Sequence, residues 1–243
     1  MTIKDLPDNY PWFPDSGRYP MGDSGELAAR LNSAVVFDRR GEVIYVDNMS
    51  HGLAPYTVLT SGVGAGARVV TASSLVSGYA IRLTGGSNFD ECANITKYLS
   101  VPDVNKWGLE TAVSFIDAFA SFRASLFYYT GAVAYHMGVI IDDDANEIQI
   151  DTEGVGYTKI ADLPASVLAG DLYHNIKIVG DMRTGFYDRL IVNYVEYDLS
   201  EYQIETYGAP IVQSQAVQLQ LTSDTGDNDE CDIGRVIVTS GEP

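Results

Sequence analysis

The chain has 243 residues, 46% of them hydrophobic and 11% aromatic, which is enough to bury the core of one domain. It carries 33 acidic against 15 basic residues, a net charge of −18, so its surface repels phosphate backbones and nucleic acid is excluded as an expected partner. The chain starts without an apolar run of signal-peptide length, and no later run approaches the roughly 18 apolar residues of a membrane span. We therefore expect a protein made in a cytoplasm, without a membrane partner.

The N-terminal segment differs in amino-acid composition from the rest of the chain. Prolines alternate with large aromatic residues between positions 9 and 20, without any periodicity. Because proline fixes φ and lacks an amide donor, this arm is expected to be extended. An isolated arm would expose a large apolar surface, so it either folds back on its own domain or lies on another subunit. The second alternative makes four aromatic residues candidate subunit anchors: Tyr10, Trp12, Phe13 and Tyr19.

A short helix is predicted over 23–31. Ser24 or Asp23 can cap it, while Glu26 in the first turn and Arg30 near the end suit the helix dipole. The sequence thus divides into an arm with a short helix at 1–34 and a β-domain at 35–243.

The remaining chain alternates short strand-like runs with turn residues. The acidic turn at 142–146 and the turn at 181–185 each predict a β-hairpin, and only 114–125 also suits a helical turn. Short strands at this spacing, without a fixed repeat, predict a sandwich or a barrel. Strands are predicted at 41–47, 67–72, 79–84, 93–99, 109–115, 124–129, 135–141, 147–151, 175–179, 188–193, 217–221 and 232–239.

Acidic side chains near both ends of the β-domain are candidate calcium ligands. Asp47 and Asn48 end the first predicted strand, Asp232 begins the last, and an acidic loop at 224–230 precedes it. Calcium takes several oxygen ligands from a flexible loop, and this region supplies them. The alternative is a loop kept soluble by its charge. No other cofactor is predicted.

The acidic hairpin turn offers a second calcium-like pattern. Asp142-x-Asp144-x-Asn146, with Glu153 at the twelfth position, has the ligand spacing of an EF-hand loop. Glu147 replaces the glycine of the sixth position, and the flanking sequence is β-like. A solvated turn is therefore favoured.

No catalytic set is recognisable, so we expect no catalytic residues and no enzyme. Glu230-x-Asp232-x-x-Arg235 echoes the Glu-x-Asp-x-x-Glu strand of sandwich glucanases, but an arginine replaces the second catalytic carboxylate. A Gly-x-Ser-x-Gly sequence is absent, and the histidines are isolated in the sequence, so each is interpreted as a surface or strand residue. They are His51, His136 and His174.

Carbohydrate binding stays open as an alternative, because sugar sites stack aromatic faces on pyranose rings. In a tyrosine-rich sandwich, however, most tyrosines pack with the hydroxyl outward. The tyrosines available for stacking are Tyr128, Tyr129, Tyr135, Tyr157, Tyr173, Tyr187 and Tyr194.

Several stretches resemble one family. Asp47-Asn48-x-x-x-Gly52-Leu53-x-x-Tyr56 is similar to the opening of concanavalin A-like (laminin-G-like) jelly rolls, and 77–83 and 231–239 resemble their later strands. The paired runs 174–178 and 187–193 resemble two more. The resemblance implies an all-β, antiparallel jelly-roll β-sandwich, and the extended N-terminal arm and short helix predicted above precede it.

The stretch at 25–41 resembles uncharacterised proteins of tailed phages and prophages. This resemblance implies a non-catalytic virion structural protein, a capsid decoration or head-fibre subunit anchored through its arm and assembled in the host cytoplasm. The implied partners are the major capsid protein or another virion protein, and further copies of the chain as a homo-oligomer, with a trimer suited to a local threefold axis. The alternative is a lectin-like, glycan-binding module or a tail component that recognises a host surface.

Overall fold

Alternating apolar and polar residues along short runs of chain build two antiparallel sheets. The structure is a computed structural model that describes residues 41–71, 78–100, 106–165, 167, 172–208, 213–224 and 229–243. All regular structure in this described part is β-strand. The strands are β1 (Glu42–Asp47), β2 (Thr57–Ser61), β3 (Gly66–Thr71), β4 (Tyr79–Thr84), β5 (Cys92–Leu99), β6 (Lys106–Phe115), β7 (Ser121–Tyr129), β8 (Val133–Asp142), β9 (Glu147–Thr152), β10 (Gly156–Asp162), β11 (His174–Asp181), β12 (Phe186–Val192), β13 (Val195–Asp198), β14 (Glu205–Gly208), β15 (Ser214–Thr222) and β16 (Glu230–Ser240).

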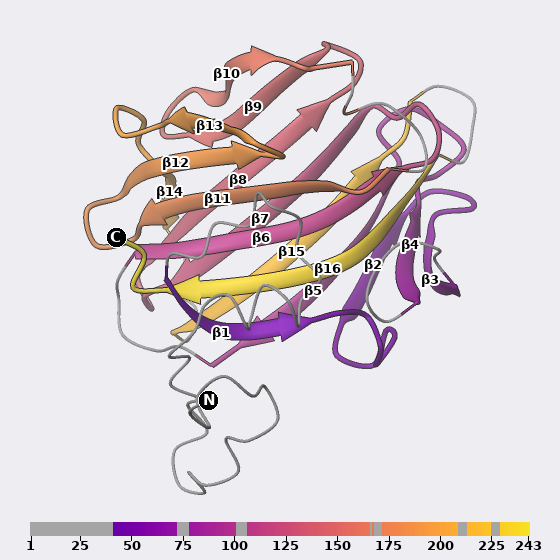
Figure 1. Ribbon diagram of the computed structural model, residues 1–243, viewed down its shortest axis with the longest axis horizontal. Coiled ribbons are helices and arrows are strands. Elements are labelled where there is room, and N and C mark those ends of the chain that lie inside the picture. The colour runs from indigo at the N-terminus through magenta and orange to yellow at the C-terminus, as the bar shows by residue number, and fades with distance from the viewer. Residues whose placement is uncertain are drawn as a thin grey trace, which may run out of the picture. The chain divides into compact units, whose positions relative to one another are not determined.

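The two sheets form the layers of a sandwich. Sheet A has the order β13-β12-β11-β6-β16-β4-β3, with β1 beside the last half of β16. Sheet B has the order β10-β9-β8-β7-β15-β5-β2, with β14 beside the start of β8. Figure 1 shows β12, β11, β6 and β16 of sheet A in front of β8, β7 and β15 of sheet B. Strands distant in sequence pair at the centre of each sheet, β6 with β16 and β7 with β15, which confirms the predicted jelly-roll sandwich.

The core fills the space between the sheets. On β6, Trp107 and Leu109 point into the core, and on β15 of the other sheet Leu219 and Leu221 belong to the same buried cluster. On β16 the period of two is interrupted by a bulge that follows Ile233. The bulge lets Ile233 and Val236, three residues apart, both point into the core. A strict two-residue period would have turned the second half of this strand outward.

Both predicted hairpins are confirmed, since β8 pairs with β9 and β11 with β12. The ambiguous segment 114–125 forms two strands joined by a short loop, in which Phe119 stacks on Phe115. Four strands were not predicted, β2, β10, β13 and β14. They are short or lie at sheet edges, and β2 is exposed along its whole length, so its residues show no alternation between apolar and polar types.

The arm, the helix predicted over 23–31 and the domain boundary predicted at 34/35 lie outside the described residues, and they stay predictions. In the described part of the chain, no helix is long and apolar enough to cross a membrane. Both cysteines are free, with Cys92 on sheet B and Cys231 in the core of sheet A.

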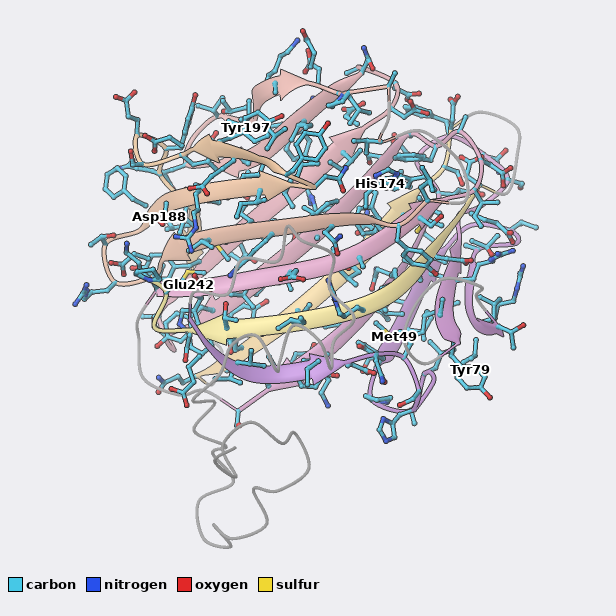
Figure 2. All side chains as sticks on the ribbon, in the orientation of Figure 1. Met49, Tyr79, His174, Asp188, Tyr197 and Glu242 are labelled. Atoms are coloured by element: carbon cyan, nitrogen blue, oxygen red, sulfur yellow. The ribbon has the colours of Figure 1, made fainter. Side chains whose placement is uncertain are left out.

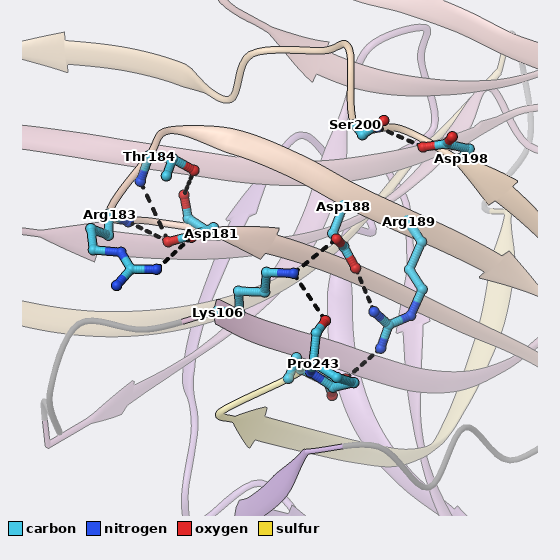
Figure 3. Close-up of polar contacts among 10 residues, drawn as sticks. Lys106, Asp181, Arg183, Thr184, Asp188, Arg189, Asp198, Ser200 and Pro243 are labelled. Carbon is cyan, nitrogen blue, oxygen red and sulfur yellow. Dashed lines mark hydrogen bonds and ion pairs between the residues drawn. The ribbon is translucent and has the colours of Figure 1, made fainter.

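The last residues of the chain are tied into sheet A by buried charges. Figure 2 places Glu242 near Asp188, and the Glu242 side chain is fully buried. Its carboxylate accepts hydrogen bonds from the Lys177 ammonium at 2.7 Å and from the Arg189 guanidinium. Arg189 also binds Asp188, which accepts a bond from Lys106 at 3.1 Å (Figure 3). The chain end is therefore part of the folded sheet.

Candidate functional site

The residues predicted from the sequence as sites are placed as follows. The four arm anchors, Tyr10, Trp12, Phe13 and Tyr19, lie outside the described residues. The predicted calcium ligands lie on β1 and β16, and the pairing of these strands fixes how far apart they stand.

Asp47 caps the turn after β1. Its carboxylate accepts a hydrogen bond from the Met49 amide at 2.7 Å and from the Tyr56 hydroxyl at 3.0 Å. Asn48 accepts one from the Ser50 amide. Met49 has φ of 64°, a left-handed conformation that this pair of side-chain bonds stabilises. The opening motif of the predicted family therefore has a structural role in this turn.

Asp232 is held by an arginine instead. The Arg82 guanidinium donates to both of its carboxylate oxygens, at 2.7 and 2.9 Å. Asp47 pairs with Val236, four residues beyond Asp232 along β16, which corresponds to about 13 Å. The register thus keeps the two carboxylates apart, and the calcium assignment stays a prediction.

The outer face of sheet B, the side turned away from sheet A, is polar and aromatic. The inward positions of β15 carry leucine and valine, so Gln218 and Gln220 point outward. Strand pairing continues this face as rows across the sheet. One row contains Thr57, Thr96, Gln218, Ser125, Gly138, Asp151 and Tyr157. The next contains Tyr98, Ala216, Phe127, His136 and Glu205.

A network of titratable groups lies at the centre of this face. His136 Nδ1 is 3.0 Å from Glu205 Oε2, and its Nε2 is 3.0 Å from Ser125 Oγ and 3.5 Å from Asp151 Oδ2. Arg123 donates to Asp151 Oδ1 at 3.0 Å. Among the described residues, His136, Asp151 and Glu205 are the group whose nitrogen and carboxylate ligand atoms gather within 4.8 Å.

The network forms where the pairing of β8 with β9 ends and its pairing with β14 begins. Tyr187 of sheet A reaches through the core, and its hydroxyl donates to the Asp151 carbonyl at 2.6 Å. The same hydroxyl accepts a bond from the Gly138 amide. Gly138 is required because a Cβ there would stand 2.0 Å from Asp151 Oδ2. The Asp151 carboxylate consequently rests directly on the backbone of β8.

Burial sets the charge of this network. Burial lowers the pKa of His136, although the Asp151 and Glu205 carboxylates oppose the shift. Burial also raises the pKa of Asp151, against the nearby His136 and Arg123. A neutral His136 has one ring proton, and Glu205 can only accept, so we place the proton on Nδ1 and leave Nε2 as an acceptor.

Aromatic rings surround the network. Phe127 stacks between His136 at 4.3 Å and Tyr129 at 6.2 Å, measured between ring centroids. Arg123 lies 4.9 Å from the centroid of the Tyr157 ring. The Tyr98 and Tyr157 side chains are 63% and 60% exposed, so both can contact a ligand.

Ser125, His136 and Glu205 have the spacing of a serine nucleophile with its base and orienting acid. Ser125 is completely buried, however, and a substrate carbonyl cannot approach its hydroxyl. Glu230 and Asp232, the pair that echoes a glucanase strand, are both bound by Arg82 on sheet A. Neither arrangement therefore suits attack on a substrate.

Sequence reasoning named only part of this face. Of the tyrosines considered for sugar stacking, Tyr129 and Tyr157 lie on it, whereas Tyr128 and Tyr187 fill the core and Tyr194 lies on sheet A. The sequence analysis did not select the exposed Tyr98, although Thr96 and Tyr98 occupy the same face of the predicted strand. His136 was interpreted as an isolated strand residue; it lies in β8, but it contacts carboxylates from two other strands, Asp151 and Glu205. Only the strand pairing brings them together.

Solved structures share this fold at low sequence identity. A conserved carbohydrate esterase of the Shiga toxin-encoding bacteriophage phi24B matches 82% of this chain and 99% of its own, at 12% identity and a TM-score of 0.52. A Bacillus licheniformis β-glucanase matches 81% and 97%, at 12% identity and 0.50. A Bauhinia forficata lectin in complex with GalNAc matches 82% and 98%, at 10% identity and 0.50.

The chain therefore has the concanavalin A-like jelly-roll fold, which a solved phage protein also adopts. No protein-family model matches the sequence. No curated protein matches it either.

Proposed function

We propose that this protein is a non-catalytic, glycan-binding module and that the outer face of sheet B holds the sugar. The observation that carries the proposal is that two exposed rings, Tyr98 and Tyr157, lie on a sheet face that also carries amide, hydroxyl and carboxylate groups. Aromatic faces stack on the apolar side of a pyranose, and the polar groups accept or donate hydrogen bonds to its hydroxyls.

Three features support the proposal. Gln218 pairs with Thr96 and Gln220 pairs with Asn94 on the adjacent strand, so amide and hydroxyl groups lie side by side on this face. The strands that carry them, β5 and β15, are each paired on both sides, which holds the polar groups in place and lowers the ordering cost of binding. The structures that share the fold include a lectin in complex with the sugar GalNAc and a phage carbohydrate esterase.

The experiment is a glycan array followed by calorimetric titration of the best oligosaccharide. Tyr98→Ala and Tyr157→Ala should each weaken binding by more than about fivefold, since truncating a central aromatic contact costs over about 1 kcal/mol. Tyr194→Ala is the matched control, because Tyr194 is 80% exposed but belongs to the β12–β13 turn of sheet A. Equal losses in all three variants, or no glycan bound at all, would refute the proposal.

The virion is the proposed location. The resemblance of 25–41 to tailed-phage proteins supports it, as does the phage esterase that shares the fold. In this proposal the arm anchors the module as a decoration or head-fibre subunit on a capsid protein, and the sandwich projects outward. Deletion of residues 1–24 should abolish incorporation into particles while leaving glycan binding intact. Normal incorporation of the truncated chain would contradict the anchoring role.

A further inference from the structure

The Asp151 carboxylate has an unusual environment. Its side chain is 2% exposed, and Oδ2 accepts no hydrogen bond from the residues that the structure describes. A buried carboxylate oxygen without a donor is costly, and such cases call for a specific explanation. The other oxygen, Oδ1, is fixed by Arg123, so Oδ2 is oriented toward His136.

The group that faces this oxygen is also an acceptor. With the His136 proton on Nδ1, the lone pair of Nε2 stands 3.5 Å from Asp151 Oδ2. The Ser125 hydroxyl, 3.0 Å from Nε2, has one proton and can serve only one of the two acceptors. A cation between the two lone pairs would satisfy both.

The separation of the two acceptors fits a metal ion. Zn²⁺ binds imidazole nitrogen and carboxylate oxygen at about 2.0–2.2 Å, and tetrahedral angles then place the two ligand atoms roughly 3.3–3.5 Å apart. The observed distance between Nε2 and Oδ2 is 3.5 Å. An imidazole ligand favours Zn²⁺ or a neighbouring transition metal over Ca²⁺ and Mg²⁺, which prefer oxygen.

We propose that His136 Nε2 and Asp151 Oδ2 bind a divalent transition-metal ion of the Zn²⁺ class, with Ser125 Oγ beside it. Glu205 accepts a hydrogen bond from Nδ1–H and so holds the imidazole in the tautomer that a metal needs. Arg123 holds the carboxylate in the orientation that faces the ion. The net charge of the site is −1, from the two carboxylates of Asp151 and Glu205 and the guanidinium of Arg123. A bound divalent cation changes it to +1.

The site goes beyond the proposed glycan binding and is measured without any sugar. Untagged, chelator-treated full-length protein is titrated with ZnCl₂ by calorimetry, and Co²⁺ is followed by its visible absorption as a second probe. We expect one ion per chain. His136→Ala and Asp151→Asn should abolish binding, and Glu205→Gln should weaken it about 10–100-fold, because that residue acts through the imidazole.

His51→Ala is the control for adventitious histidine binding, since His51 is exposed on the turn after β1. Asp151→Asn keeps the shape of the side chain, and circular dichroism verifies that each variant is folded. Stoichiometric binding that survives in both folded variants, or no binding by the wild type, overturns the proposal. Neither result changes the outcome of the glycan titration, so failure of the metal proposal can be distinguished from failure of the glycan proposal.

Discussion

Replacement of the penultimate residue, Glu242→Ala, should destabilise the whole sandwich. The Glu242 side chain is fully buried, and the carboxylate is shared by two buried cations, Lys177 and Arg189, and by the Thr239 hydroxyl. A Cβ on Gly108 would stand 2.8 Å from Glu242 Oε1, so the backbone of β6 also lies against this group. Loss of the carboxylate leaves both cations without the anion they share.

The cost follows from the burial of the partners. Removing one member of a buried ion pair costs about 3–5 kcal/mol. The free energy of unfolding of a folded domain is about 5–15 kcal/mol, so the variant should lose a large share of its stability. At about 2–4 °C per kcal/mol for a chain of this size, the melting temperature should fall by roughly 6–20 °C.

The assay is urea unfolding followed by circular dichroism, with Asp162→Ala as the control. Asp162 is an exposed acid that forms an ion pair with Lys159, and exposed ion pairs contribute little to stability. Glu242→Ala should therefore unfold at a clearly lower urea concentration than Asp162→Ala. Equal midpoints for the two variants would show that the C-terminal residues are not part of the cooperative fold.

Three other perturbations have defined outcomes. Tyr187→Phe removes the hydroxyl that bonds the Asp151 carbonyl and the Gly138 amide, and should cost about 1–3 kcal/mol in urea unfolding; an unchanged midpoint would contradict this. Gly138→Ala should displace the Asp151 carboxylate and weaken Zn²⁺ binding in a folded protein, and wild-type affinity in this variant would argue against the site. Zn²⁺ at a hundred times its dissociation constant should add about 2.7 kcal/mol to the free energy of unfolding, and His136→Ala should lose that gain; the same gain in the variant would place the ion elsewhere.

Most of the fold could be predicted from the sequence, because burial between two sheets imposes a period of two on the inner strands. Edge strands such as β2 escaped prediction, since a strand exposed on both faces has no such period. Glu242 could not be recognised either. It follows the last apolar run, and only the folded sheet shows that the residue is buried.

The candidate site was harder to predict than the fold. His136, Asp151 and Glu205 come from three strands, and each occupies an outward position where the pattern predicts exposure. His136 and Asp151 are nevertheless buried, with Phe127 stacked on His136 and Arg123 bound to Asp151. Local sequence determines which face of a strand a residue occupies, but long-range pairing determines which residues meet.

NMR chemical-shift mapping is the most direct test of glycan binding to the outer face of sheet B. Amide chemical shifts of the isotopically labelled protein are recorded while the oligosaccharide selected on the array is added. The account predicts saturable shifts that cluster on β5, β15, β7 and β10, around Thr96, Tyr98 and Tyr157. Shifts confined to sheet A or to the turns, with this face unchanged at saturation, would contradict it.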